Sequence, residues 1–324
     1  MSVLKTSVLF AILILVAHSA SGQSGNSPHN SRTVVRTNSN LVIVPTVVRS
    51  DSGELIENLD ADDFRLTDQQ TEQQVHVEEV RNQSAAVVLL LQTGGAASRQ
   101  FRNYDKLDRI LESILDNSTC KLALVTFDSR VRQIWAFPPR VDGLDYGLTH
   151  QEGGDHGAAI RDAVLYATSL LQAQSSSFRR IILLFSQRED AGSRATVAEV
   201  MRDVARSGAT VYSLTFHAEK REVKNDEGKF GTLGPKEAAM NNATAAEVAA
   251  QSGGEIIPFE NEDQLAEALS IVGKDLHAAY LLSFRPSTPT LGLHAIKVEV
   301  IGQRGGVEVL ARRMYWIDNN APDN

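Results

Sequence analysis

The sequence predicts an α/β fold in which a doubly wound, mainly parallel sheet is inserted into a small β-sandwich formed by both termini. The first observation is the run Val87–Leu91, whose five consecutive apolar residues suit a central strand covered by helices on both faces. The second is the alternation of strand-like and helix-like segments from Ser84 to His277. The third is that the flanks, 41–83 and 278–317, contain only strand-like patterns, which predicts that they pack together.

The composition indicates a globular protein with no general affinity for polyanions. Of the 324 residues, 42% are hydrophobic and 22% are charged, as in ordinary folded domains. The formal net charge of −8 argues against a nucleic-acid-binding protein and against attachment to anionic membranes by charge. The one cysteine, Cys120, cannot form an intramolecular disulfide, and its apolar surroundings in the sequence predict a buried thiol.

Residues 1–22 are typical of a secretory signal peptide. Lys5 precedes the apolar core Val8–Ala17, and the small residues Ala20 and Gly22 precede a plausible cleavage site. The apolar core is too short for a membrane-spanning helix, and no lipoprotein cysteine follows it. We therefore expect export to the periplasm or the extracellular space with no stable membrane anchor after cleavage, the alternative being an uncleaved anchor. Residues 23–40 are polar and predict a flexible lead-in.

The two flanks predict strands of a separate β unit. Pro45 lacks a backbone N–H and indicates that the first strand lies at an edge or contains a bulge. Residues 318–324 form a short polar tail. The expected strands are Leu41–Arg49, Asp62–Thr67, Gln74–Val80, Ala279–Phe284, His294–Ile301 and Val307–Tyr315.

The central region, 84–277, predicts the main sheet and its helices. Only the turn Asp128-Ser129 separates two of its strands, so these two must be antiparallel. The charged segment His217–Met240 predicts a surface excursion. The expected strands are Val87–Leu91, Lys121–Phe127, Val131–Phe137, Arg180–Phe185, Thr210–Phe216 and Glu255–Pro258. The expected helices are Tyr104–Leu115, Ala158–Gln172, Thr196–Ser207, Ala243–Gln251 and Glu262–Leu276.

This order of elements resembles a von Willebrand factor A domain over residues 84–277. More narrowly, the chain resembles the A-domain-related secreted proteins of Acidobacteria, in which β segments precede and follow the A domain. The front segment Asp51-Ser52-Gly53…Asp63-Phe64 and the tail Tyr280–Pro286…His294 carry this part of the resemblance. The resemblance implies a Rossmann-like domain that binds other proteins.

The working part of that family is a metal-ion-dependent adhesion site, which this sequence lacks. The family pattern is Asp-x-Ser-x-Ser after the first strand, a Thr that opens a later helix, and an Asp after a further buried strand. Those hard oxygen ligands suit Mg²⁺. Here Gln92, Gly94, Ala96, Ala158 and Gln187 stand at these positions. The resemblance therefore implies a degenerate site that holds neither a metal ion nor a cofactor, and whose loops could serve as a binding rim.

Other polar residues at the same end of the sheet offer alternatives. A rebuilt metal site could use the loop carboxylates Asp128, Asp155, Glu189 and Asp190, although solvated loop carboxylates are the simpler interpretation. Catalysis by Ser98 or by Asp155-His156 lacks any recognisable constellation. The glycines after the first strand of the main sheet do not make a dinucleotide-binding motif.

These observations favour an exported, non-enzymatic protein-interaction module of the adhesion type. Its partner is a protein of unknown identity, and neither nucleic acid nor a metal ion is expected to bind. The alternative is a structural or assembly component of a secreted or envelope complex, in which the A domain serves as a rigid spacer. An enzyme of unknown type is the third class, and it would require titratable groups that converge in one cleft.

Overall fold

The structure is a computed structural model. It describes residues 41–79, 84–114, 120–137, 146–148, 150–216, 244–277, 280–302 and 306–318. The predicted signal peptide, the polar lead-in and the predicted excursion His217–Met240 lie outside the described residues, as does all but the first residue of the tail. None of the helices in the described segments is both long enough and apolar enough to cross a membrane.

Six strands form the main sheet, and their order is that of a doubly wound fold. From one edge to the other the order is β10-β9-β8-β5-β6-β7, so the chain starts in the middle and builds outward in both directions. All neighbours are parallel except β6 and β7, which are antiparallel as predicted. The strands are β5 (Ala85–Gln92), β6 (Cys120–Phe127), β7 (Val131–Trp135), β8 (Arg179–Ser186), β9 (Thr210–Thr215) and β10 (Ile256–Pro258).

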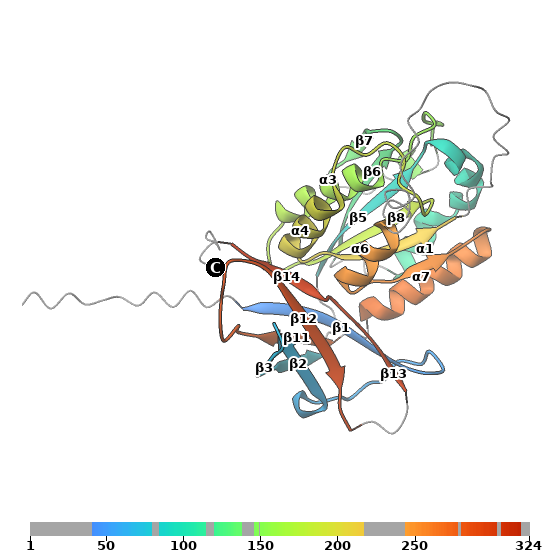
Figure 1. Cartoon of the computed structure of the whole chain (residues 1–324). Helices are drawn as coiled ribbons and strands as arrows, with labels where there is room; N and C mark the ends of the chain where they lie inside the picture. The colour runs from blue at the N-terminus through green and yellow to red at the C-terminus, as the bar shows by residue number, and fades with distance from the viewer. Residues whose placement is uncertain are drawn as a thin grey trace, which may run out of the picture. The chain divides into compact units, whose positions relative to one another are not determined.

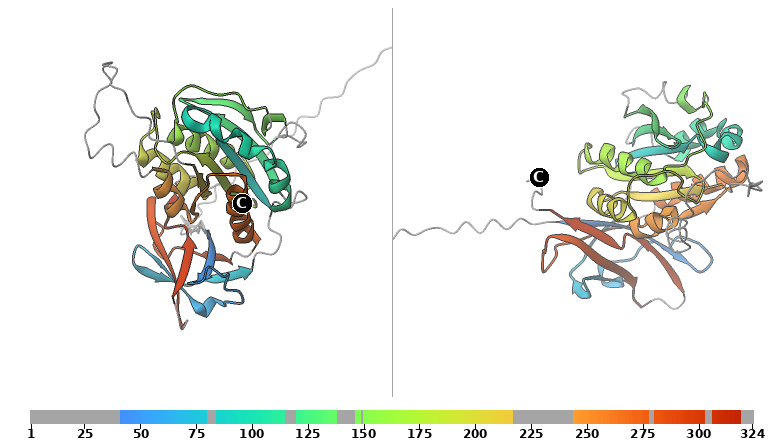
Figure 2. Two further views of the ribbon diagram at one scale, coloured as in Figure 1. Left: turned by 90° about the vertical axis from the view of Figure 1, so that its right-hand side faces the viewer. Right: turned by 45° about the horizontal axis from the view of Figure 1, so that its top comes forward.

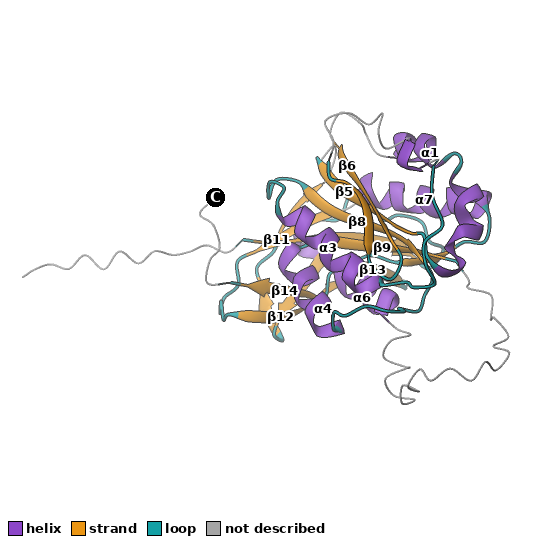
Figure 3. Ribbon diagram, turned by 90° about the horizontal axis from the view of Figure 1, so that it is seen from above, coloured by secondary structure: helices purple, strands orange, loops and turns teal. Residues whose placement is uncertain are grey.

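Helices cover both faces of this sheet (Figures 1 and 3). One face packs against α1 (Leu107–Ile114) and α7 (Glu262–His277). The other packs against α3 (Ile160–Gln172), α4 (Val197–Ser207) and α6 (Thr244–Ser252). The predicted helix Tyr104–Leu115 begins later than expected, at Leu107, because Gly95–Tyr104 forms a 3₁₀ helix ahead of α1.

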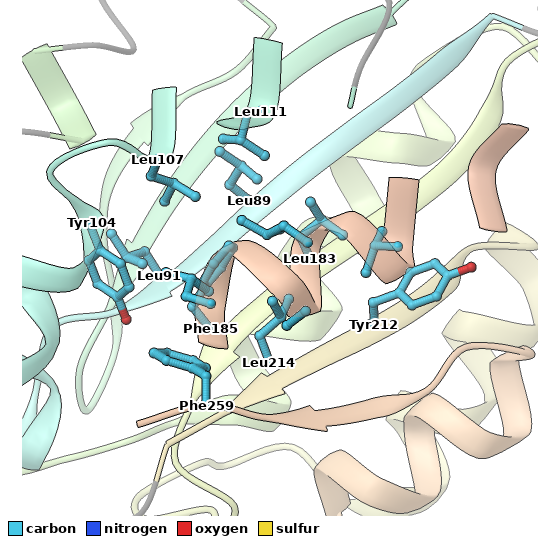
Figure 4. Close-up of a cluster of buried hydrophobic side chains, with 14 of the residues drawn as sticks. Leu89, Leu91, Tyr104, Leu107, Leu111, Leu183, Phe185, Tyr212, Leu214 and Phe259 are labelled. Carbon is cyan, nitrogen blue, oxygen red and sulfur yellow. The ribbon is translucent and has the colours of Figure 1, made fainter. Parts of the chain in front are cut away.

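Strand β5 is buried along its whole length, which is why its sequence is apolar on both faces. Leu89 and Leu91 point into the cluster that also contains Tyr104 and Phe185 (Figure 4). The alternate residues, including Leu90, point to the opposite face and join the cluster around α3. Full burial of one such side chain stabilises the fold by about 1.5–3 kcal/mol. Cys120, predicted as buried, is half-buried at the start of β6.

The flanks pack together as a sandwich, as predicted (Figure 2). They form two four-stranded antiparallel sheets that share one core, and the short strand at Thr71–Gln73 was not predicted. The first sheet has the order β13-β1-β11-β4, so a strand from before the main sheet lies between two from after it. The second has the order β14-β12-β2-β3, so two strands from after the main sheet lie beside two strands from before it. The strands are β1 (Val42–Ser50), β2 (Phe64–Asp68), β3 (Thr71–Gln73), β4 (His76–Glu79), β11 (Tyr280–Phe284), β12 (Gly292–Val300), β13 (Val307–Ala311) and β14 (Met314–Ile317).

The last predicted strand, Val307–Tyr315, is wrong as a single element. It divides into β13 in one sheet and β14 in the other. At the break the backbone turns toward the end of α6, where Arg313 N donates to Gln251 O at 2.9 Å. A Cβ added to Gly253 would lie 2.4 Å from Arg312 N, so only glycine permits this close approach. A contact distant in sequence therefore ends the strand.

Strand β1 is an inner strand, so the expectation of an edge strand is wrong. It pairs with β11 from Val42 to Thr46 and with β13 from Thr46 to Ser50. Pro45 nevertheless lies in the half of β1 that is paired on one side only, where a missing N–H is tolerated.

A buried ion pair joins the sandwich to the α/β part. Arg49 on β1 donates two hydrogen bonds to Asp275 on α7, at 2.8 and 2.7 Å, and one to Glu255 at 2.9 Å. The side chains of Arg49 and Asp275 are only 9% and 1% exposed. Burial acts to lower the pKa of Arg49, but the hydrogen bonds and charges of the two carboxylates outweigh it and raise that pKa. Burial raises the pKa of Asp275, and Arg49 offsets part of the rise.

Candidate functional site

The strand order of the main sheet locates the candidate site. In doubly wound sheets ligands bind beyond the carboxyl ends of the strands, where the order reverses. Here the reversal lies between β5 and β8, which pair in parallel. Gln92 ends β5, and Gln187 directly follows β8. Two of the five predicted site residues therefore stand at the switch point.

An amide bridge joins these two glutamines. Gln92 Nε2 donates to Gln187 Oε1 at 3.2 Å, and the Gln187 backbone N–H donates to Gln92 Oε1 at 2.9 Å. Gln92 Nε2 also donates to Gly94 O at 2.9 Å, and Gln187 Nε2 donates to Glu189 O at 2.9 Å. The Gln92 side chain is buried with both its amide oxygen and its amide nitrogen hydrogen-bonded, so the bridge links the loops after β5 and β8.

A glycine-rich loop closes over the end of β5. We call residues Gly153–Gly157 the strap. Gly154 N donates to Thr93 O at 2.9 Å, and Gly95 N donates to Asp155 O at 2.7 Å. The strap is thus hydrogen-bonded to both sides of Gly94.

The strap leaves no room for a side chain at position 94. A Cβ added to Gly94 would lie 2.2 Å from Gly157 O and 2.7 Å from the Asp128 Cβ. The φ angle of Gly94 is −85°, so packing and not backbone conformation demands glycine here. A serine, which the family pattern has at this position, does not fit this arrangement.

The remaining predicted residues, Ala96 and Ala158, lie on separate elements. Ala96 is half-buried in the 3₁₀ helix that follows Gly94. Ala158 is fully buried just before α3, and its backbone exchanges two hydrogen bonds with Ala191, at 2.7 and 2.8 Å. Since Gln92, Gly94 and Ala158 are all buried, only Ala96 and Gln187 bring side chains of this set near the surface.

The loop carboxylates are occupied by cations and hydrogen-bond donors of the chain itself. Arg132, on β7, forms an ion pair with Asp128, and its Nη2 lies 3.6 Å from Asp155 Oδ2. Asp128 Oδ2 also accepts from Asp155 N at 3.1 Å. Asp155 Oδ1 accepts from Ser129 N at 3.0 Å and Gly157 N at 2.8 Å, while Oδ2 accepts from the Ser129 hydroxyl.

These partners keep both carboxylates ionised. Desolvation on burial acts to raise the pKa of Asp128, but the hydrogen bonds from Arg132 and from two backbone N–H groups outweigh it, so the pKa is lowered. The pKa of Asp155 is lowered chiefly by the hydrogen bond from the Ser129 hydroxyl, with help from Gly157 N.

The second pair of predicted loop carboxylates does not join this cluster. The Asp190 side chain is buried, pairs with Arg161 at 3.1 Å and accepts from Ser193 Oγ at 2.6 Å, so it holds the loop after β8 against the start of α3. Among the described residues, no group of three or more His, Cys, Asp or Glu side chains could hold a metal ion. Neutral amides, closed loops and paired carboxylates do not fit a divalent cation.

A second polar network, in the sandwich, was not predicted. His294 is buried, and its Nδ1 lies 3.0 Å from Asp68 Oδ1. Its Nε2 lies 2.6 Å from Thr290 O, and Tyr315 donates from its hydroxyl to Asp68 Oδ2 at 2.7 Å. Both ring nitrogens are engaged, so the network links β2, β12 and β14. The Asp68 partner is 226 residues away, and no local sequence pattern could indicate it.

Comparisons with known proteins give likenesses among solved structures alone. No family model matches the sequence, and no curated protein matches it. BatB from Bacteroides thetaiotaomicron is 16% identical with a TM-score of 0.43, over 59% of this chain and 98% of that one. A von Willebrand factor type A protein from Catenulispora acidiphila is 10% identical with a TM-score of 0.44, over 88% and 76% of the two chains. Proximal thread matrix protein 1 from the mussel byssus, with a zinc-occupied MIDAS motif, is 14% identical with a TM-score of 0.44, over 64% and 50%.

Proposed function

We propose that the chain is an exported, non-enzymatic protein-interaction module, built on a von Willebrand factor A-like domain whose adhesion site no longer uses a metal ion. The closed and neutral switch point is the observation that supports this most strongly. The Gln92–Gln187 bridge supplies internally what a cation would supply, namely a link between the loops after β5 and β8. The partner is a protein, and contact with it does not depend on a bound ion.

The accessible part of the degenerate site supports the proposal that the loops at this end of the sheet contact the protein partner. Ala96 and Gln187 are half-buried, while Ser98 and His156 are exposed at the same end of the sheet. In this proposal these loops offer small and neutral groups, which favour shape complementarity over the capture of an acidic side chain. The nearby carboxylates Asp128 and Asp155 are engaged within the chain, which argues against acid–base chemistry there.

A structural or assembly component of an envelope complex is the second candidate. The buried Arg49–Asp275 pair favours it, because it ties the sandwich to the α/β part as a rigid spacer requires. In that case the protein is recovered in fixed stoichiometry with a larger assembly, whereas an interaction module is recovered with one discrete partner.

Cross-linking in the native cell envelope, with and without EDTA, tests the proposal. We expect one partner, recovered equally in both conditions and lost in the variant Ala96→Arg, which places a large cation on the half-buried loop. Lys297→Ala, on the exposed face of the sandwich strand β12, is the control and should retain the partner. Loss of the partner in EDTA would contradict the metal-independent contact. Retention in Ala96→Arg would exclude this loop as the contact, and recovery only as part of a fixed assembly would favour the structural role.

A further inference from the structure

We propose that Arg132 is an internal latch, and that its guanidinium holds the strap closed over the switch point by bridging Asp128 and Asp155. The inference does not rest on the proposed function, because it concerns only how the chain controls access to its own loops. Arg132 contacts both carboxylates, since it pairs with Asp128 and approaches Asp155 to 3.6 Å.

The first step is that Asp128 needs a positive partner. Its side chain is fully buried, and a buried carboxylate without a compensating charge is strongly unfavourable. It lies directly beneath the strap, where a Cβ added to Gly154 would be 2.7 Å from Asp128 Oδ2. The positive charge of Arg132, which compensates Asp128, is therefore located next to Gly154 of the strap.

The second step is that Asp155, a residue of the strap, connects the strap to Asp128. Asp155 N donates to Asp128 Oδ2 at 3.1 Å, while Asp155 O accepts from Gly95 N at 2.7 Å. Its carboxylate accepts hydrogen bonds from the backbone N–H groups of Ser129 and Gly157. One residue of the strap thus contacts the turn after β6, the loop after β5 and the latch.

The third step is that the two carboxylates repel each other when Arg132 is removed. They lie close enough that the charge of Asp155 acts to raise the pKa of Asp128. Without the guanidinium the easiest relief is movement of the strap, because Asp155 is exposed and can swing into water whereas Asp128 cannot. Opening would uncover Gly94 and the Gln92–Gln187 bridge. The side chain of Arg132 is itself 34% exposed, so an acidic group on another molecule could compete for it.

Hydrogen exchange on the full chain tests the latch. The reporters are the amides of Gly95 and Gly154, which donate across the strap, and β1 of the sandwich serves as an internal reference. In Arg132→Gln we expect these two amides to exchange about tenfold faster or more, since a hydrogen bond to a charged group is lost. Arg132→Lys keeps the charge and should stay near the wild type. Arg130→Gln removes an exposed arginine from the same turn and should change nothing.

A double-mutant cycle separates the latch from general destabilisation. Asp155→Asn weakens the hydrogen bonds from Ser129 and Gly157, so it should also speed exchange in the strap. It also removes one of the two repelling charges, so Arg132→Gln should add little in that background. If exchange in β1 rises equally in Arg132→Gln, that variant has unfolded globally. The proposal is then tested with Asp155→Asn alone. Unchanged protection of Gly95 and Gly154 in that variant would overturn the proposal, as would effects of the two substitutions that simply add.

Discussion

Replacement of Arg49 by methionine should destabilise the protein by several kcal/mol. Arg49 and Asp275 approach to 2.7 Å, and at an effective dielectric constant of about 20 their gross attraction is about 6 kcal/mol. Desolvation of two buried charges offsets most of this, so the net value of the pair is small. The single substitution is different, because it leaves Asp275 buried without its hydrogen-bonded counter-ion. We expect the free energy of unfolding to fall by about 3–5 kcal/mol.

The two tryptophans make this measurement specific. Trp135 lies on β7 of the main sheet, and Trp316 lies on β14 of the sandwich, so each reports on one part of the chain. Urea unfolding followed in Trp135→Phe and in Trp316→Phe backgrounds gives one transition for each part. Coincident transitions in the otherwise unchanged protein would show that the two parts unfold together.

Two further variants decide whether the reasoning is right. In Arg49→Met/Asp275→Leu no buried charge is left unpaired between these two residues, so most of the lost stability should return. The exposed pair of Lys297 and Glu299 is the control, and Lys297→Met should change stability by less than about 0.5 kcal/mol. The reasoning is refuted if Arg49→Met costs no more than this control, or if the double variant is as unstable as the single one.

The pH dependence of the single variant gives an independent check. The pKa of Asp275 is already raised in the folded protein, and loss of Arg49 removes the main effect that lowers it. A carboxyl group whose folded pKa is raised destabilises the fold above that pKa, and the lost stability returns as pH falls through it. The deficit of Arg49→Met should therefore shrink under mildly acidic conditions. A deficit that grows on acidification would contradict this assignment.

Two other predictions concern the strap. Gly94→Ser should destabilise the protein by about 1–3 kcal/mol through overpacking against the strap, whereas Gly153→Ser, with nothing closer than 3.9 Å to its Cβ, should be nearly neutral in thermal melts. Equal melting temperatures would disprove the steric closure. The folded pKa values of Asp128 and Asp155 lie below the ordinary 3.8, so the stability they contribute is present above that value and is lost as pH falls through the folded values. Acid titration followed by circular dichroism should show a shallower loss in Arg132→Gln, and an identical profile would count against the ion pair.

The main sheet was predictable because its signals are local. The run around Leu89 is apolar on both faces, and the short turn at Asp128 forces β6 and β7 to be antiparallel. The switch-point position of Gln92 and Gln187 followed from the same strand order. The hydrogen bonds between the two glutamines could not be predicted. The local sequence does not determine whether a side-chain amide bonds to water, to the backbone or to another amide.

The features that escaped prediction depend on contacts between distant segments. The strap is a loop whose placement is decided by the space above Gly94, which belongs to another loop. The break between β13 and β14 follows from the approach of Arg312 to Gly253. The partner of Arg49 lies 226 residues away, beyond any pattern of spacing. In each case the local sequence permits several conformations, and tertiary packing selects one.

Calorimetric titration of the full chain with Mn²⁺ and Mg²⁺ tests the central claim most directly. The claim is that the switch point is held by an amide bridge and an internal arginine, and that it has no use for a cation. The predicted result is no saturable heat at submillimolar metal, and thermal melts that do not change with chelator. Saturable binding that disappears in Gln92→Ala would show that the amide bridge is a working metal site. Binding that survives Gln92→Ala but is lost in Asp155→Ala or Asp190→Ala would place a rebuilt site on the loop carboxylates, and it would contradict the account equally.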